Sequence, residues 1–268
     1  MKKRTVLGKK VELIVKDDTA APDVTKRLAQ ELVVNEKVQV LAGFGLTPLA
    51  LSTAPIATQS KTPLVVMAAA TSSITQASPY IIRTSFTLPQ AAVAMGDWAP
   101  RNGIKKVVSL VSDYGPGIDA EKFFKDRFLF NGGQVLETLR VPMRNPDFAP
   151  FLQKVRDLKP DALYVFVPSF QKANGGLRPN FMAVGGYDGM RVIYEALRAT
   201  KGQGGGDALL AAMKGQIFES PRGPMFIDAQ TRDVVHNIYI RKVERVNGQL
   251  FNNEFESLKD VKDPGKSR

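Results

Sequence analysis

The chain has no cysteine and only one histidine among its 268 residues. Without cysteine it has no disulfides, no thiol nucleophiles and no thiolate metal ligands. A single imidazole cannot form a pair of histidine ligands, and His236 lies in a strand-like run, 236–246, where we expect a structural role. Enzymes and metal sites that depend on cysteine or on paired histidines are therefore excluded.

Long apolar runs are also missing. No stretch reaches the length needed to cross a bilayer, which predicts a protein that is not membrane-embedded. The start, MKKRTVLGKKVELIVKDD, is basic but has no apolar core segment before a cleavage site, so as written it is not a secretory signal peptide. If the sequence is complete, we expect a cytoplasmic protein.

The charge balance is strongly one-sided, with a formal net charge of +11. Such an excess is typical of proteins that bind nucleic acid, an anionic surface or an acidic partner. Here the basic residues are spread along the chain, without an aromatic-interleaved patch or a recognisable nucleic-acid-binding module. We therefore expect a solvated basic surface and no nucleic-acid partner.

The most informative part of the sequence holds two short apolar runs that each end in small or hydroxyl residues. The runs 38–42 and 63–67 are rich in branched residues and too short for helices, as buried parallel strands are. Between them, Thr47 and Pro48 predict an N-cap followed by proline, which would open a helix over 49–59. The pattern predicts a strand, loop, helix, strand unit.

Two loops of this unit form a predicted ligand site. Loops 43–47 and 68–73 would emerge at the carboxyl ends of adjacent strands, where open α/β sheets bind ligands. Gly43 and Gly45 allow the backbone to approach a ligand closely, and the free amides of the following helix start favour an anion. The sequence therefore predicts a corner that binds a carboxylate or a phosphate.

Two consecutive blocks of the sequence each alternate predicted strands with predicted helices. This predicts an α/β fold with two parallel-sheet lobes and a ligand cleft between them. The first lobe is predicted over 1–103, and 172–220 is expected to return to it. The second is predicted over 104–171, with a hairpin in 221–258 added to it and 259–268 as a tail.

The predicted elements are strands at 11–15, 80–85, 105–112, 134–141, 162–167, 236–246 and 249–255, and helices at 24–35, 89–98, 118–130, 148–158, 181–200 (loosened at Gly185-Gly186) and 207–214, with Asn247-Gly248 as a hairpin turn.

Catalytic motifs are weak or missing. The sequence has no Walker A segment, GxSxG elbow, HExxH helix or calcium loop, so we predict no catalytic residue, no metal and no cofactor. A GxGxxA pattern at 115–120, with Glu137 near the end of the next strand, keeps open a dinucleotide-binding enzyme or a ligand sensor on the same fold. Pro116 counts against it, because proline stiffens the turn that should wrap the pyrophosphate.

Four segments, in their order and spacing, resemble the branched-chain amino acid type of substrate-binding protein, the extracytoplasmic receptors of ABC importers. The segments are VELIVKDD (11–18), GFGLTP (43–48), AAATS (68–72) and SDYG (112–115), and the resemblance covers most of the chain. It implies two Rossmann-like lobes of the type I periplasmic binding protein kind, joined by three crossovers and closing on a small molecule. It also implies a periplasmic location and an ABC permease as partner.

The resemblance implies roles for individual residues. Thr47 and neighbouring backbone amides would hold the ligand carboxylate. The Ala69 carbonyl and the Thr71 hydroxyl would hold an α-amino group, and Tyr114 would pack from the second lobe. The predicted ligand-binding residues, including two that supply apolar contacts, are Phe44, Gly45, Leu46, Thr47, Ala69, Ala70, Thr71 and Tyr114.

The sequence also departs from the family pattern. Family members begin with a strand and helix upstream of the position matching Val11, and that strand lies centrally in the first lobe, whereas MKKRTVLGKK stands here. Near 170–172 the chain skips part of the second lobe, including the acidic residue that pairs with a ligand ammonium. We therefore expect an incomplete version of the fold that binds a branched-chain amino acid or a related aromatic or aliphatic carboxylate.

Overall fold

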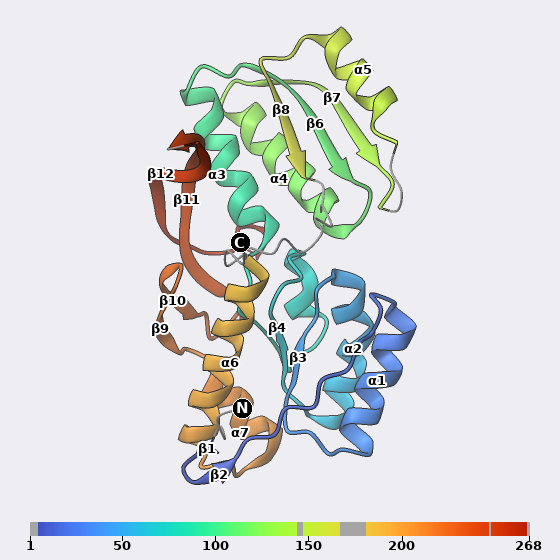
Figure 1. Cartoon of the computed structure of the whole chain (residues 1–268), viewed down its shortest axis with the longest axis vertical. Coiled ribbons are helices and arrows are strands. Elements are labelled where there is room, and N and C mark those ends of the chain that lie inside the picture. The colour runs from blue at the N-terminus through green and yellow to red at the C-terminus, as the bar shows by residue number, and fades with distance from the viewer. Residues whose placement is uncertain (1–4, 144–146, 167–180, 247, 267–268) are drawn as a thin grey trace. The chain divides into compact units, whose positions relative to one another are not determined.

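The structure is a computed structural model of the chain and describes residues 5–143, 147–166, 181–246 and 248–266 (Figure 1). By its contacts the chain divides into two compact units. One combines Met1–Phe86 with Pro179–Asn237, and the other combines Thr87–Arg178 with Ile238–Arg268. Each unit holds one three-stranded parallel sheet, which confirms the predicted α/β class. The skipped region near 170–172 and the turn residue Asn247 lie outside the described residues.

The first unit is built around a parallel sheet of order β3-β4-β5. Figure 1 shows α1 and α2 on one side of this sheet and α6 and α7 on the other. The three residues of β4 are fully buried because both faces are covered. Its elements are β1 (Thr5–Val6), β2 (Lys9–Lys10), α1 (Pro22–Val34), β3 (Leu41–Gly43), α2 (Thr47–Ser60), β4 (Leu64–Val66), the 3-10 helix η1 (Ser72–Gln76), β5 (Ile81–Arg83), α6 (Phe181–Ala199), α7 (Gly205–Met213), β9 (Ile217–Ser220), β10 (Gly223–Ile227) and the start of β11 (Val234–Val246).

The second unit has a parallel sheet of order β7-β6-β8, so β6 is central. The end of α3 is tied to α4 by Asn131, whose side-chain amide donates to the Asp97 carboxylate at 2.8 Å. The elements of this unit are α3 (Leu88–Arg101), β6 (Lys106–Ser112), α4 (Gly115–Phe130), β7 (Gln134–Val141), α5 (Ala149–Leu158), β8 (Ala162–Phe166), the rest of β11, β12 (Gln249–Val261) and the 3-10 helix η2 (Pro264–Lys266).

The contact division differs from the predicted lobe boundaries. It assigns α3 to the second unit, whereas the sequence prediction kept residues up to 103 in the first lobe. The difference arises because α3 packs along α4 of the second unit. The predicted tail, 259–268, also begins inside β12, which runs to Val261 beside β11.

Most predicted helices and strands are present, but the first predicted strand is wrong. Residues 11–18 form neither helix nor ladder, although their composition is that of a strand. A strand needs a hydrogen-bonding neighbour, and the sheet order of the described residues provides none for this segment. The short antiparallel strands β9 and β10 were not predicted, because the turn between them, Pro221-Arg222, carries no strong hairpin signal.

Helix α6 is continuous, so the predicted loosening at Gly185-Gly186 is wrong. Gly185 serves packing instead: a Cβ there would lie 2.0 Å from the carbonyl oxygen of Met67, just after β4. A Cβ at Gly189, one turn further along, would lie 2.5 Å from the Met67 side chain. The Thr84 hydroxyl also donates to the Gly185 carbonyl at 3.2 Å. The two glycines let α6 approach β4 closely.

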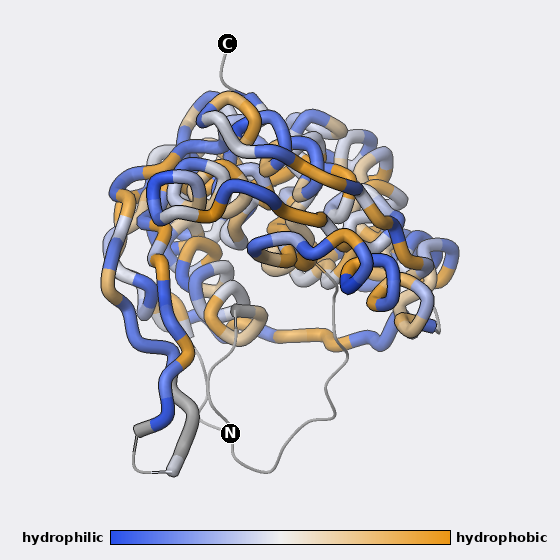
Figure 2. The backbone as a smooth tube through the Cα atoms, turned by 90° about the horizontal axis from the view of Figure 1, so that it is seen from above, coloured by the Kyte–Doolittle hydropathy of each residue, from blue (hydrophilic) through white to orange (hydrophobic). Residues whose placement is uncertain are grey.

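Hydrophobic and hydrophilic residues alternate along the backbone in Figure 2. This alternation is typical of helices and strands that turn one face to a core and the other to water. Among the helices of the described ranges, none is both long enough and apolar enough to cross a membrane.

Candidate functional site

The loops that follow β3 and β4 lie against each other in the first unit. The Met67 amide donates to the Gly43 carbonyl at 2.8 Å, and the Ala69 amide donates to the Phe44 carbonyl at 3.0 Å. Parallel pairing of β3 with β4 brings their carboxyl ends to one edge, as the sequence predicted. Phe44 adopts φ 67°, a left-handed conformation that is uncommon for a bulky residue and is concentrated at functional sites.

Thr47 is the first residue of α2 and not its cap, so that prediction is wrong. Leu46 occupies the N-cap position, and no side chain makes a cap bond. The Thr47 hydroxyl instead lies 2.9 Å from the Thr71 hydroxyl of the second loop. Both residues are buried, with 4% and 8% of their surface exposed. The two hydroxyls stand beside the start of α2, where backbone amides and the helix dipole favour an anion.

The carbonyl groups of the second loop already accept hydrogen bonds from β5 and the residues after it. The Ser85 hydroxyl donates to the Ala69 carbonyl at 3.1 Å, and Arg83 Nη2 donates to the Thr71 carbonyl at 2.6 Å. A ligand ammonium needs acceptors, whereas a carboxylate needs donors. These bonds use part of the acceptor capacity of the two carbonyls, which leaves less of it for a ligand ammonium.

Arg83 belongs to a buried ion pair that sequence analysis missed. Its Nε lies 3.3 Å from Asp233 Oδ1, and both side chains are essentially inaccessible to solvent. The Thr75 hydroxyl donates to the other oxygen of Asp233 at 3.2 Å. The available signal was an arginine at the end of an otherwise apolar strand, since a buried charge requires a partner. This network fixes the loop that carries Thr71.

Tyr114 lies in the second unit, at the N-cap position of α4. Its ring stacks on Phe166, with centroids 6.5 Å apart and planes 14° from parallel. Burial raises the pKa of the Tyr114 hydroxyl to about 12, so the phenol stays neutral at ordinary pH. It stays a prediction that Tyr114 and the loops of the first unit contribute to one ligand site.

One glycine of the GxGxxA pattern, Gly117, has a packing explanation. A Cβ at Gly117 would lie 1.8 Å from the Ser112 carbonyl oxygen at the end of β6, so α4 could not start this close to its strand with any other residue. The fold itself therefore accounts for Gly117 without a bound dinucleotide. Within the described residues there is also no group of three or more acidic or histidine side chains placed to hold a metal.

The predicted ligand residues of the first unit gather in the two facing loops. Phe44 and Leu46 are half-buried and Gly45 is exposed, whereas Ala69 and Ala70 are buried. Their contact with a ligand stays a prediction.

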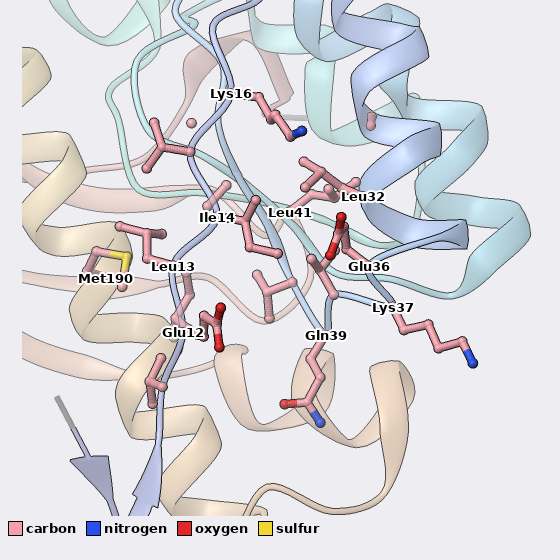
Figure 3. Close-up of a pocket in the computed structure, with 18 of the residues that line it drawn as sticks. Glu12, Leu13, Ile14, Lys16, Leu32, Glu36, Lys37, Gln39, Leu41 and Met190 are labelled. Carbon is pink, nitrogen blue, oxygen red and sulfur yellow. The ribbon is translucent and has the colours of Figure 1, made fainter. Parts of the chain in front are cut away.

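A cavity of about 860 Å³ also lies in the first unit, away from most of these residues. Figure 3 shows side chains from residues 12–16 on one side of it and from residues 39–41 on the other. Of the predicted ligand residues, Phe44 and Gly45 line it, at the end where β3 stops. The cavity and the paired threonines are therefore separate features of the unit.

Two α/β units with parallel sheets, and a corner of hydroxyls beside a helix start, define a small-molecule binding protein of the periplasmic type. The family model described as periplasmic binding protein matches residues 1–169 and 165–249. The chain therefore belongs to the periplasmic binding protein family, as the resemblance implied, and its relatives are solute-binding proteins of ABC transporters.

Three relatives show how similar the chain is. It is 36% identical over 324 aligned positions to Leu/Ile/Val-binding protein homolog 6 of Brucella abortus, covering 95% of this chain and 83% of the relative. A Rhodopseudomonas palustris solute-binding protein in complex with 3,4-dihydroxybenzoic acid is 50% identical, with a TM-score of 0.94 over 98% of this chain and 90% of that chain. A second one, in complex with p-hydroxybenzoic acid, is 36% identical, with a TM-score of 0.92 and the same coverage.

Proposed function

We propose that this protein binds an aromatic carboxylic acid of the benzoate type and presents it to the permease of an ABC importer in the periplasm. The acid's carboxylate is held in the first unit by the hydroxyls of Thr47 and Thr71 and by amides at the start of α2. The protein acts as a binder and carries out no chemistry on its ligand.

One observation carries the choice of ligand class. One proton of the Thr47 and Thr71 hydroxyls lies in the bond between them and the other can be donated to a ligand, while the Ala69 and Thr71 carbonyls already accept bonds from Ser85 and Arg83. Asp233, a buried carboxylate of this network, is engaged by Arg83 and Thr75. An amino acid ligand would bring an ammonium that needs a free acceptor or an acidic partner, because an unpaired buried charge is costly. A benzoate brings no such group.

The relatives support the same class. Two solute-binding proteins that are 50% and 36% identical to this chain were crystallised with dihydroxy- and hydroxybenzoic acid. The relative named for leucine, isoleucine and valine is 36% identical. Phe44, Leu46 and Tyr114 are the side chains we propose to contact the aromatic ring, because aromatic and aliphatic groups favour an apolar ring in such sites.

Titration calorimetry with 3,4-dihydroxybenzoate, 4-hydroxybenzoate, leucine and NAD tests the proposal. We expect both benzoates to bind at least about tenfold more tightly than leucine, a difference of about 1.4 kcal/mol, because only leucine must bury an ammonium. NAD should give no heat beyond dilution.

Tighter binding of leucine than of either benzoate would overturn the proposed ligand class and restore the amino acid alternative. Binding of NAD alone would favour a dinucleotide enzyme or sensor on this fold. The amide of 4-hydroxybenzoate, which has the same ring without the anionic carboxylate, is the matched control. It should bind much more weakly than 4-hydroxybenzoate if the carboxylate is held as proposed.

A further inference from the structure

Four asparagines of the chain stand directly before a glycine, and two of them lie in described parts of the second unit. Asn102 follows the end of α3, and Asn131 follows the end of α4. Such pairs are chemically labile, because glycine has no side chain to hinder attack of its backbone nitrogen on the asparagine side chain. The second unit therefore places the same chemistry in two different environments.

The backbones of the two pairs are almost the same. Both asparagines are C-cap residues, with φ −100° and ψ 25° at Asn102 and φ −88° and ψ 17° at Asn131. Each is followed by a left-handed glycine, Gly103 at φ 85° and Gly132 at φ 78°. The amide of each glycine donates to the helix carbonyl three residues earlier, at 3.3 Å for Gly103 and 3.0 Å for Gly132. Because these amides are engaged, each turn must open before the nitrogen can attack, and the ease of opening sets the rate.

Asn131 is held firmly between α3 and α4. Its side-chain nitrogen lies 2.8 Å from the Asp97 carboxylate, 2.9 Å from the Arg127 carbonyl and 3.3 Å from the Gly96 carbonyl, and these three acceptors share its two N–H groups. The residue is half-buried, and a Cβ on Gly133 of the same turn would lie 2.3 Å from a buried aromatic ring of α4. Opening this turn would break all of these contacts.

Asn102 is held less firmly. The residue is exposed, and its side-chain amide donates to the Trp98 carbonyl at 2.8 Å. Pro100 in the last turn of α3 has no backbone N–H, so it cannot donate to the Gly96 carbonyl as another helical residue would. The turn at Asn102 therefore has fewer contacts to break, and we expect it to open more readily than the turn at Asn131.

We propose that Asn102 is a site of spontaneous deamidation, which makes the end of α3 acidic while Asn131 stays intact. The Gly103 nitrogen attacks Cγ of Asn102, and the new C–N bond closes an imide ring. The side-chain nitrogen leaves as ammonia and takes the proton of the Gly103 amide. Water then adds to either carbonyl of the imide and gives aspartate or isoaspartate, and no oxidant or reductant takes part.

The product changes the end of the helix in two ways. A carboxylate at position 102 faces the Trp98 carbonyl that the amide bonds, and it adds negative charge where the helix dipole is already negative. Isoaspartate also lengthens the backbone between α3 and β6, which disturbs the bond from the Ile104 amide to the Ala99 carbonyl at 3.1 Å. The modification therefore loosens the connection into the central strand β6, and it is independent of the proposed carboxylate site at Thr47 and Thr71.

The test incubates the full chain in mildly alkaline water enriched in heavy oxygen. Hydrolysis of the imide leaves one oxygen atom from water in the product, so mass spectrometry of the peptides that hold Asn102 and Asn131 measures both rates. We expect Asn102 to change at least about tenfold faster than Asn131 in the folded chain, and the two rates to be similar in urea, where both turns are open. Equal rates in the folded chain, or faster change at Asn131, would overturn the proposal.

Asp97→Ala tests how Asn131 is protected, because it removes a carboxylate that accepts from the Asn131 side chain. The rate at Asn131 should rise at least about threefold, whereas the rate at Asn102 should change little. Asp97→Asn keeps an oxygen acceptor at this position and is the matched control. An equal rise at both asparagines would contradict protection by this contact.

Trp98, the only tryptophan of the chain, reports the consequence for α3. Its fluorescence should shift to longer wavelength as Asn102 is modified, because the end of the helix opens to water. Asn102→Gln, whose longer side chain closes an imide ring far more slowly, is the control and should keep its spectrum. An unchanged spectrum after complete modification would overturn the proposed loosening of the helix end.

Discussion

The two parallel sheets of this protein share a strand-helix pattern but differ in how they are buried. In the first unit, the sheet, its helices and β9 to β11 join one continuous hydrophobic core around the fully buried strand β4. In the second unit, Val107 of β6 belongs to one small cluster, while Val108 and Leu110 belong to another. Helix α5 buries no residue completely, and 51% of Val165 in β8 is exposed.

The comparison shows that the order of strands and helices determines the class of a fold but not how completely its sheet is buried. The first unit combines its large core with a buried ion pair beside the predicted ligand loops. The second unit relies on an aromatic stack, in which Phe124 lies 3.8 Å from Tyr164 and 5.2 Å from Phe128, measured between ring centroids. We therefore expect polar substitutions to damage the first unit most and aromatic ones the second.

Loss of the buried arginine of the first unit, Arg83, should have the largest effect on stability. Arg83→Met leaves the Asp233 carboxylate buried without its arginine, which should lower the free energy of unfolding by about 3–5 kcal/mol. Urea denaturation followed by circular dichroism measures the change. Adding Asp233→Leu should recover part of the loss, because both charges are then gone. If Arg83→Met alone were as stable as the parent chain, the Arg83–Asp233 pair would contribute nothing to stability.

Removal of the aromatic stack in the second unit should lower the free energy of unfolding by a similar amount. Phe124→Ala deletes a ring that is 2% exposed and should cost about 3–5 kcal/mol through lost burial and the cavity left behind. Phe151→Ala, which removes a partly buried ring of α5, is the matched variant and should cost less. Hydrogen exchange should locate the loss in α4 and β6. Equal losses for the two variants would contradict the role given to the stack.

Acid should lower the stability of the first unit through its single histidine, His236. Burial, and then the charge of Arg222, lower the pKa of His236 from 6.5 to about 4. Because the unfolded chain binds a proton below pH 6.5 and the folded chain does not until about pH 4, stability falls as the pH drops through this window. The loss should total about 3 kcal/mol, measured by denaturation at several pH values.

His236→Gln should remove this part of the pH dependence. The second unit has no histidine, so hydrogen exchange in β6 and α4 should lack the same pH response. An unchanged pH profile in the variant would show that other groups set it.

The smallest effect is expected on ligand affinity. Thr47→Val removes one hydroxyl of the pair that faces Thr71 and should weaken benzoate binding by about 1–3 kcal/mol. Tyr114→Phe, which removes a hydroxyl from the second unit and keeps the ring, should change affinity much less. Calorimetry on both variants decides this, and an unaffected Thr47→Val would remove the threonine pair from the proposed site.

The sequence predicted the order of helices and strands well because periodicity and flanking residues are local signals. It failed at Val11 to Val15, where a strand-like composition lacks a neighbour, and strand pairing is a tertiary property. It also assigned the Thr47 hydroxyl to a helix cap, because the competing partner, Thr71, is distant in sequence.

The candidate site was predictable only in part for the same reason. The two loops follow from the carboxyl ends of parallel strands, which sequence patterns can locate. The Arg83–Asp233 pair joins residues 150 positions apart, and nothing local in the chain links them. The cavity beside β3 depends on the absence of a ladder, which composition cannot reveal.

Two of the three glycines of α6 have a consequence for how this binding protein can diversify. Gly185 and Gly189 allow the helix to touch Met67, the residue that leads into loop 68–73. A methyl group at Gly185 would have to displace either the helix or that residue, and the shift would pass directly into the loop. If loop 68–73 contacts the ligand as proposed, changes of ligand preference can originate on a helix remote in sequence, and screens for altered selectivity should include positions 185 and 189.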